Sequence, residues 1–239
     1  MIAEDNKFKN ILRQKNTRKI NKLQNNAKSM NRIIKFLMIS DILVLTSFGL
    51  IDPILAIFFK ENLVGGTIFA AGLASTIFLL VKSCVQLPFS KYVDSSNYNV
   101  RLRWLIIGSF LISSVPFIYI FINDIKMVYL VQIIYGLGSG LAYPSWLGLW
   151  STNLDKQKES FEWSLYSTLT GLGIALTAVV GAALSQYVGF NYTFLLVGFL
   201  SLIGSFVLFA LEKQDKKMNV LMAKNYHKKR KLIPNQRHH

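Results

Sequence analysis

The sequence has 239 residues, of which 52% are hydrophobic, and its mean hydropathy is +0.36. A water-soluble domain of this size cannot bury so large an apolar fraction in one core, so the composition excludes an ordinary soluble protein. The net charge of +15 suggests nucleic acid at first, but most of this charge lies at the ends of the chain. The composition therefore favours an all-α integral membrane protein.

Six nearly uncharged runs follow one another along the chain, at 36–59, 64–89, 104–122, 127–150, 163–188 and 192–211. Each has about the 20 residues that an α-helix needs to cross the apolar core of a bilayer. None shows the alternation of polar and apolar residues that is typical of outer-membrane barrel strands. The runs predict six transmembrane helices in a membrane domain, 36–211, between a basic N-terminal segment, 1–35, and a basic C-terminal tail, 212–239.

The positive charge predicts the orientation of these helices. Ten Lys or Arg residues lie in 1–35 and nine in 212–239. The loops after the second and fourth runs are also basic, with Lys91, Arg101, Arg103, Lys156 and Lys158. Because cations gather on the cytoplasmic side, we expect a protein of the cell membrane with both termini in the cytoplasm. The basic tails are suited to anionic lipids, and no nucleic-acid-binding module accompanies them.

The aromatic and metal-binding residues extend this interpretation. Trp104, Trp146, Trp150 and Trp163 all fall at the predicted cytoplasmic ends of helices, which predicts an interfacial tryptophan belt. All three histidines lie in the C-terminal tail, so none is left in the membrane to bind a metal or to act as a catalytic base. We therefore expect no metal, no cofactor and no enzymatic activity.

A weak internal repeat runs through the predicted membrane domain. Gly-Leu-Ile-Asp-Pro at 49–53 returns as Gly-Leu-Ala-Tyr-Pro at 140–144, and Ile-Gly-Ser-Phe at 107–110 returns unchanged at 203–206. Two shorter patches recur in the same order at nearly the same offset. Four ordered matches are difficult to attribute to chance, so the sequence predicts a duplicated unit.

The two predicted units, about 36–122 and 127–211, contain three crossings each. The second unit must therefore cross the membrane in the opposite sense to the first, which makes the repeat inverted. The span 36–211, with a Gly-rich fourth helix at 136–140, resembles one half of a major facilitator superfamily transporter. The resemblance implies a six-helix bundle that takes part in alternating access.

Two short motifs depart from the pattern of that family. The loop at 90–95 keeps the acid, Asp94, but lacks the usual glycine and arginine. In the fourth helix, Gln132 stands where many proton-coupled members carry an arginine. The resemblance therefore implies the fold but not proton coupling, and fold alone does not identify a substrate.

Asp52 is the first candidate for a substrate path, because an ionisable side chain inside a bilayer is costly. It directly precedes Pro53, whose missing N–H frees a nearby carbonyl. Gln132 and Tyr135 lie at a similar depth, and the resemblance implies that the first and fourth helices line the path. The complete pathway set is Asp52, Gln132, Tyr135, Tyr143, Ser167 and Thr168. Alternatively, Asp52 is protonated or only caps the broken backbone.

Asp41 and Lys82 lie at a similar depth near the inner ends of the first and second predicted helices, so they can pair. Two interpretations remain open. The pair is either a buried structural contact, or it serves gating or ion coupling together with Glu162 at the start of the fifth helix. Gating positions or helix breaks are predicted at Pro53, Pro144 and Asp94.

The predicted function is secondary transport of a small solute by alternating access. One polar side of a six-helix bundle cannot face lipid cheaply, so we expect a half-transporter that forms a parallel homodimer. The first, second, fourth and fifth helices would line the interface, with the third and sixth outermost. The alternative is a non-transporting accessory or structural subunit of a larger membrane complex.

Overall fold

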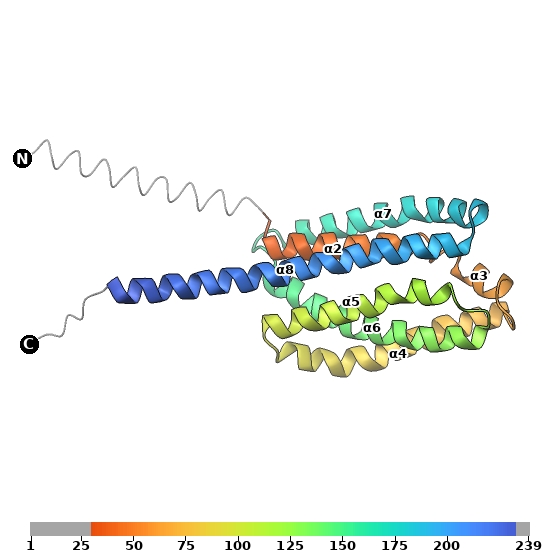
Figure 1. The fold of residues 1–239 in the computed structure, drawn as a ribbon, viewed down its shortest axis with the longest axis horizontal. Coiled ribbons are helices and arrows are strands. Elements are labelled where there is room, and N and C mark those ends of the chain that lie inside the picture. Colours follow the sequence, from red (N-terminus) through yellow and green to blue (C-terminus); the bar gives the residue numbers. More distant parts are fainter. Residues whose placement is uncertain (1–29, 233–239) are drawn as a thin grey trace, which may run out of the picture.

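The structure of the protein, a computed structural model, describes the backbone of residues 30–232 and the side chains of residues 30–213. The segments expected to contact anionic lipid, 1–35 and 212–239, lie largely outside the residues whose side chains are described. The described chain is almost entirely helical (Figure 1), with α2 (Arg32–Gly49), α3 (Leu55–Glu61), α4 (Ile68–Asp94), α5 (Tyr98–Tyr119), α6 (Ile125–Asn153), α7 (Glu159–Tyr187) and α8 (Phe190–Leu232).

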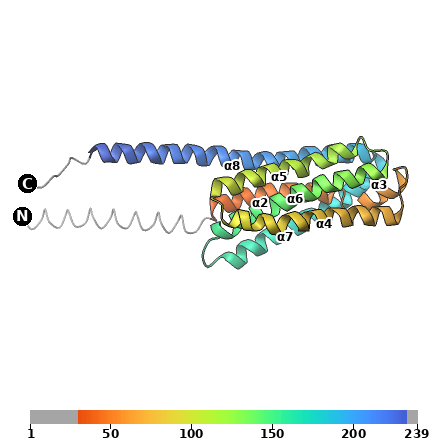
Figure 2. The same ribbon diagram turned by 90° about the horizontal axis from the view of Figure 1, so that it is seen from below.

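Five of the described helices are long and apolar enough to cross a membrane, namely α4, α5, α6, α7 and the Phe190–Lys213 part of α8. Helix α2 has 18 residues, three of them charged, and continues through a turn into the short helix α3. Together, α2 and α3 take the place of the first predicted crossing. Successive crossings run in opposite directions, and α8 leaves the bundle at the end where α2 begins (Figures 1 and 2). The prediction of an all-helical, multi-pass membrane fold is confirmed.

The first crossing is not the single helix that the run 36–59 predicts. Helix α2 ends before Asp52, and α3 begins after Pro53, which has no N–H with which to continue the helical pattern. Helix α7 passes close to this break, where Gly181 lies directly against the carbonyl of Leu50. The break therefore combines a local cause with tight packing of a neighbouring helix.

Helix α6, in contrast, continues through Pro144, so the prediction of a break there is wrong. Helices α4 and α5 both pack along α6. Gly140 lies against the carbonyl of Lys82 in α4, and Gly138 approaches α5 as closely. Packing from two sides holds the helix despite the hydrogen bond that proline removes. Asp94 is the last residue of α4 and marks a helix end rather than an interruption.

The helices are arranged in three layers, which Figure 2 shows edge-on. Helices α5 and α8 pack against each other on one side, α2 and α6 lie in the middle, and α4 and α7 lie on the other side. Helix α4 packs on α6, and α7 packs on α2. In the most apolar part of each helix, only 17% of α4 and 11% of α7 is buried, against 50% of α5 and α6. The layer of α4 and α7 therefore leaves the largest uncovered surface.

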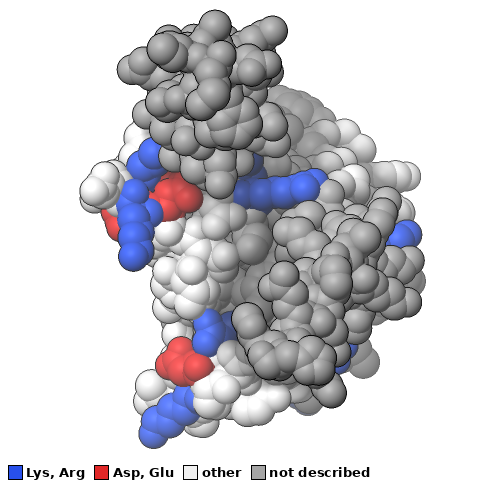
Figure 3. All heavy atoms as spheres, turned by 90° about the vertical axis from the view of Figure 1, so that its left-hand side faces the viewer, with Lys and Arg blue, Asp and Glu red and all other residues white. Residues whose placement is uncertain are grey.

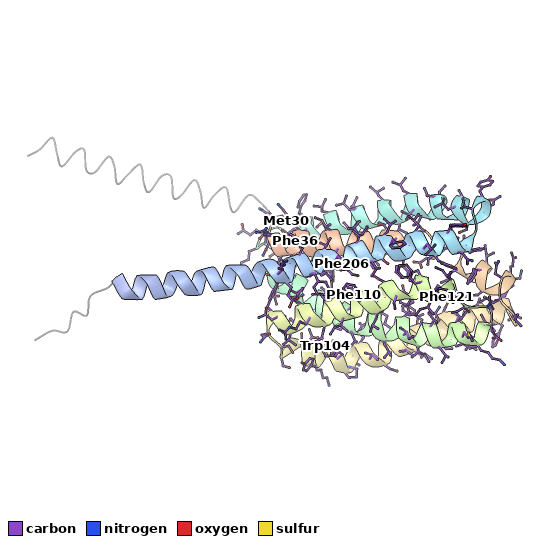
Figure 4. The ribbon with its side chains drawn as sticks, in the orientation of Figure 1. Met30, Phe36, Trp104, Phe110, Phe121 and Phe206 are labelled. Carbon is purple, nitrogen blue, oxygen red and sulfur yellow. The ribbon has the colours of Figure 1, made fainter. Side chains whose placement is uncertain are left out.

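The two copies of the Ile-Gly-Ser-Phe segment meet where α5 contacts α8. The rings of Phe110 and Phe206 lie edge to face with their centroids 5.4 Å apart (Figure 4). One turn away, the hydroxyls of Ser113 and Ser205 are 3.0 Å apart and fully buried. A hydrogen bond between hydroxyls satisfies both groups at a depth where water is absent.

Basic side chains gather at the end of the bundle where α2 begins, as Figure 3 shows. Among them, Arg101 of α5 ties the turn after α4 to α6. Its guanidinium donates hydrogen bonds of 3.0 to 3.1 Å to the carbonyls of Val93, Asp94, Ser96 and Gly148. Because the last carbonyls of a helix lack partners within the helix, this arginine caps the end of α4.

Candidate functional site

A cavity of about 280 Å³ lies within the bundle and is lined by side chains from α2, α4, α5, α6, α7 and α8, together with Asp52 from the turn after α2. Five of the residues singled out from the sequence contribute to its wall, namely Asp41, Asp52, Lys82, Tyr135 and Tyr143. The structure thus brings together the charged side chains of the first two crossings with two tyrosines of α6. Such a group of polar residues in an apolar bundle marks a candidate site.

Asp41 and Lys82 line the same cavity but are not an ion pair. The hydroxyl of Tyr166 in α7 donates a hydrogen bond to the Asp41 carboxylate. The Lys82 ammonium instead lies 5.2 Å from the centre of the Tyr143 ring and 5.9 Å from that of Phe78. No salt bridge joins Asp41 to Lys82. The expected pairing is therefore wrong, because equal depth does not fix the direction in which each side chain points.

Three aromatic rings from three helices stack across the cavity. Tyr135 of α6 stacks on Phe48 of α2 with centroids 5.3 Å apart, and on Phe78 of α4 with centroids 4.3 Å apart. In the sequence, Phe48 lies between Asp41 of α2 and Asp52 of the turn that follows α2. Along the first crossing, the stacked Phe48 ring therefore comes between the two carboxylates that line the cavity.

Three other predicted pathway residues lie elsewhere. Gln132 is in the core, 3% exposed, and its amide donates to the Tyr119 hydroxyl at 3.2 Å. Its amide oxygen has no hydrogen-bond partner among the residues that the structure describes. Ser167 and Thr168 are exposed on the far face of α7, and Tyr166 reaches the cavity in their place. The prediction found the correct helices but the wrong faces of them.

Glu162 belongs to a separate polar group at the end of the bundle where α2 begins. Its carboxylate is 1% exposed and accepts a hydrogen bond of 3.3 Å from the backbone N–H of Asp155. The Asp155 carboxylate in turn accepts one of 3.0 Å from the backbone N–H of Asn31. These contacts hold the loop between α6 and α7 against the start of α2. Glu162 does not line the cavity, so a role beside Asp41 and Lys82 is not supported.

Three of the four tryptophans expected in an interfacial belt form an aromatic cluster, whereas Trp104 of α5 packs edge to face on Phe89 of α4. Trp146 and Trp150 stack with centroids 4.9 Å apart and are 6% and 0% exposed. Trp163 and Tyr166 of α7 pack on Trp150 at 5.3 Å and 5.2 Å. The cluster joins α6 to α7, and Trp146 also lines the cavity.

Part of the site escaped the sequence prediction. Ser139, Tyr143 and Trp146 all line the cavity, and only Tyr143 was predicted. Their spacing of four and three residues places them on one face of a helix, so this periodicity could have found them. Tyr166 carried no comparable signal, because its role depends on the approach of α7 to α2.

The contact between Asp41 and Tyr166 can be tested by double-mutant cycles. We expect Asp41→Asn and Tyr166→Phe to couple by about 1 kcal/mol or more, since each change removes the same charge-assisted hydrogen bond. Asp41→Asn and Lys82→Gln should add to within about 0.5 kcal/mol. Reversible unfolding of the purified protein in detergent measures both cycles. Strong coupling of Asp41 to Lys82 without coupling to Tyr166 would contradict the geometry.

Antiparallel apolar helices around a cavity that holds charged residues define a polytopic membrane protein of the transporter class. The comparison with known families is more specific. The chain belongs to the Major Facilitator Superfamily, whose family model matches residues 37–235. The family predicted from the inverted repeat is therefore confirmed, and it is a family of membrane transporters.

Two curated relatives share weaker similarity. A proton-coupled antiporter flippase LtaA of Staphylococcus haemolyticus (strain JCSC1435) is 24% identical over 110 residues, which cover 46% of this chain and 28% of the relative. The protein of the same name from Staphylococcus saprophyticus subsp. saprophyticus is 21% identical over 103 residues, which cover 43% of this chain and 26% of the relative. The matched segments thus span little more than a quarter of each relative.

Proposed function

We propose that this chain forms one bundle of a secondary transporter that moves a small solute across the cell membrane by alternating access. The observation that carries the proposal is the cavity, which Asp41, Asp52 and Lys82 all line inside a largely apolar bundle. Charged groups at membrane depth are expensive and are retained where a substrate or ion passes. Membership of a transporter family supports the same function.

Flippase activity is a second candidate. The two relatives carry that name, and the cavity here combines charged groups with apolar walls from Phe48, Phe78 and Ile112. Such a surface suits a molecule that has a polar and an apolar part. Proton-coupled antiport, also named for the relatives, would require carboxylates on the path, and Asp41 and Asp52 supply them.

A complete path needs a second bundle, and we propose that another copy of the chain supplies it in the same orientation. This arrangement rests on the inverted repeat. The repeat is supported by matching contacts, because α4 of the first unit packs on α6 of the second, and α7 of the second unit packs on α2 of the first. The uncovered layer of α4 and α7 supports an interface there. In the competing proposal, the same layer binds another membrane protein and the chain is a non-transporting accessory subunit.

Thiol accessibility distinguishes these proposals. In a Cys84→Ser background, a cysteine at Ser139 in the cavity should react with an impermeant thiol reagent added to either side of the membrane. Alternating access opens the cavity to each side in turn, whereas a structural bundle does not. Cysteines at Asn62 and Asn123 should react only from outside and one at Ser95 only from the cytoplasm, which tests the orientation in the same experiment.

Reaction of the Ser139→Cys thiol from one side alone, with the three control positions behaving as expected, would favour the accessory subunit. Reversed labelling of Asn62 and Ser95 would instead show that the predicted orientation is wrong.

A further inference from the structure

Lys82 is a cation at membrane depth with no carboxylate beside it. Its ammonium faces the rings of Tyr143 and Phe78 at 5.2 Å and 5.9 Å, and no described carboxylate lies within salt-bridge distance of it. Ring faces stabilise a cation only in part, and a lone charge in a bundle remains costly. Because Lys82 lines the cavity, a bound molecule can supply the missing negative charge.

The two carboxylates of the cavity are poorly placed to do so. Asp41 already accepts the hydroxyl hydrogen of Tyr166 on the α7 side. Asp52 follows Phe48 along the chain and forms no salt bridge with Lys82. The charges of the cavity are therefore separated, with the positive charge at the wall formed by α4 and α6.

Two hydroxyl groups of α6 line the same cavity as the Lys82 ammonium. Ser139 and Tyr143 lie one turn apart on α6 and line the cavity. Gly140 lies between them, and a Cβ built on Gly140 would be 3.1 Å from the Lys82 carbonyl oxygen. Helices α6 and α4 are therefore in contact at this level. Neither the Ser139 nor the Tyr143 hydroxyl receives or donates a hydrogen bond within the described residues. One ammonium and two free hydroxyls form a donor set that suits an oxyanion.

We infer that Lys82, with the hydroxyls of Ser139 and Tyr143, binds an anionic phosphate-like group of the transported molecule, whose apolar part lies against Phe48 and Phe78. This inference rests on the proposed function, because it assigns the cavity to the substrate. It predicts an amphipathic anion rather than a cation or a neutral sugar. The oxyanion belongs either to such an amphipath or to free phosphate.

Calorimetric titration of the purified protein in maltoside micelles and phosphate-free buffer tests the inference. The probes are hexyl phosphate, hexyl glucoside, hexylamine and inorganic phosphate. We expect hexyl phosphate to bind at least about tenfold more tightly than the neutral and cationic probes, since a charge-assisted hydrogen bond favours the anion by about this factor. Lys82→Gln should weaken hexyl phosphate binding about tenfold, whereas Lys82→Arg should retain it.

Lys126→Gln, which removes an exposed lysine at the start of α6, is the matched control and should change nothing. Equal binding of inorganic and hexyl phosphate, both lost in Lys82→Gln, would support the site and assign it to a free anion. Unchanged hexyl phosphate binding in Lys82→Gln, or tighter binding of hexylamine, would overturn it. The titration measures binding independently of transport. If binding depends on Lys82 but Ser139→Cys is labelled from one side only, the proposed transport is contradicted and the anion site is still supported.

Discussion

Replacing Gly181 with alanine should destabilise the bundle by about 3 kcal/mol or more, at the upper end of what overpacking costs. The α-hydrogen side of Gly181 in α7 faces the backbone of Leu50, where α2 ends. A Cβ there would overlap the Leu50 carbonyl, and a backbone group cannot rotate away as a long side chain can. The new methyl group must therefore push α7 away from the break in the first crossing. Thermal or denaturant unfolding in detergent measures the loss.

Gly171→Ala is the matched control, on the same helix and with the same change. Apart from its chain neighbours and the backbone of its own helix, no described atom lies within 4 Å of a Cβ at this position. Alanine also favours a helix over glycine by about 1 kcal/mol, so Gly171→Ala should be neutral or slightly stabilising. Equal effects of the two substitutions would show that α7 does not approach Leu50 in this way.

The arrangement of the crossings could be predicted from the sequence because hydropathy measures what a bilayer selects. Apolar runs of sufficient length have few alternatives to a spanning helix, since every backbone polar group must be satisfied within the membrane. Depth along a helix follows from residue number, and Asp41 and Lys82, which the sequence predicts to share a depth, both line the cavity.

The face of a helix on which a side chain lies is harder to predict than its depth. Each residue turns the helix by about 100°, so Tyr166 faces the cavity while Ser167 and Thr168 face away. Gln132 and Tyr135 differ by less than one turn, yet the first is in the core and the second is in the aromatic stack. These outcomes depend on how neighbouring helices approach, which a single sequence does not contain.

Proline gave a similarly incomplete signal. Pro53 accompanies a real break, whereas Pro144 lies within a continuous helix. The residue removes one hydrogen bond in both places, and packing decides the result. The positions of Trp146 and Trp150 along the chain likewise predict residues at the membrane surface, whereas contacts with α7 bury both side chains within the bundle.

A cysteine on α4 should form a disulfide crosslink with a cysteine on α7 of a second copy. Nearly all of the protein should become crosslinked if the two positions face each other, and almost none if they do not. A two-fold axis along the membrane normal, placed beside the uncovered layer, sets α4 of one copy against α7 of the other. Gly72 and Ala182 are exposed, and each lies nine residues from the middle of its helix toward the end that carries α3. The two positions therefore share a depth in parallel copies.

The most direct test of the half-transporter is disulfide crosslinking in membranes between two differently tagged copies, both in the Cys84→Ser background. One copy carries Gly72→Cys and the other carries Ala182→Cys. The account predicts a dimer that contains both tags, and no dimer when the cysteines replace Ile107 and Ile203, which are exposed on the layer of α5 and α8. Crosslinks through Ile107 and Ile203 alone, or a protein that stays monomeric in lipid, would contradict it.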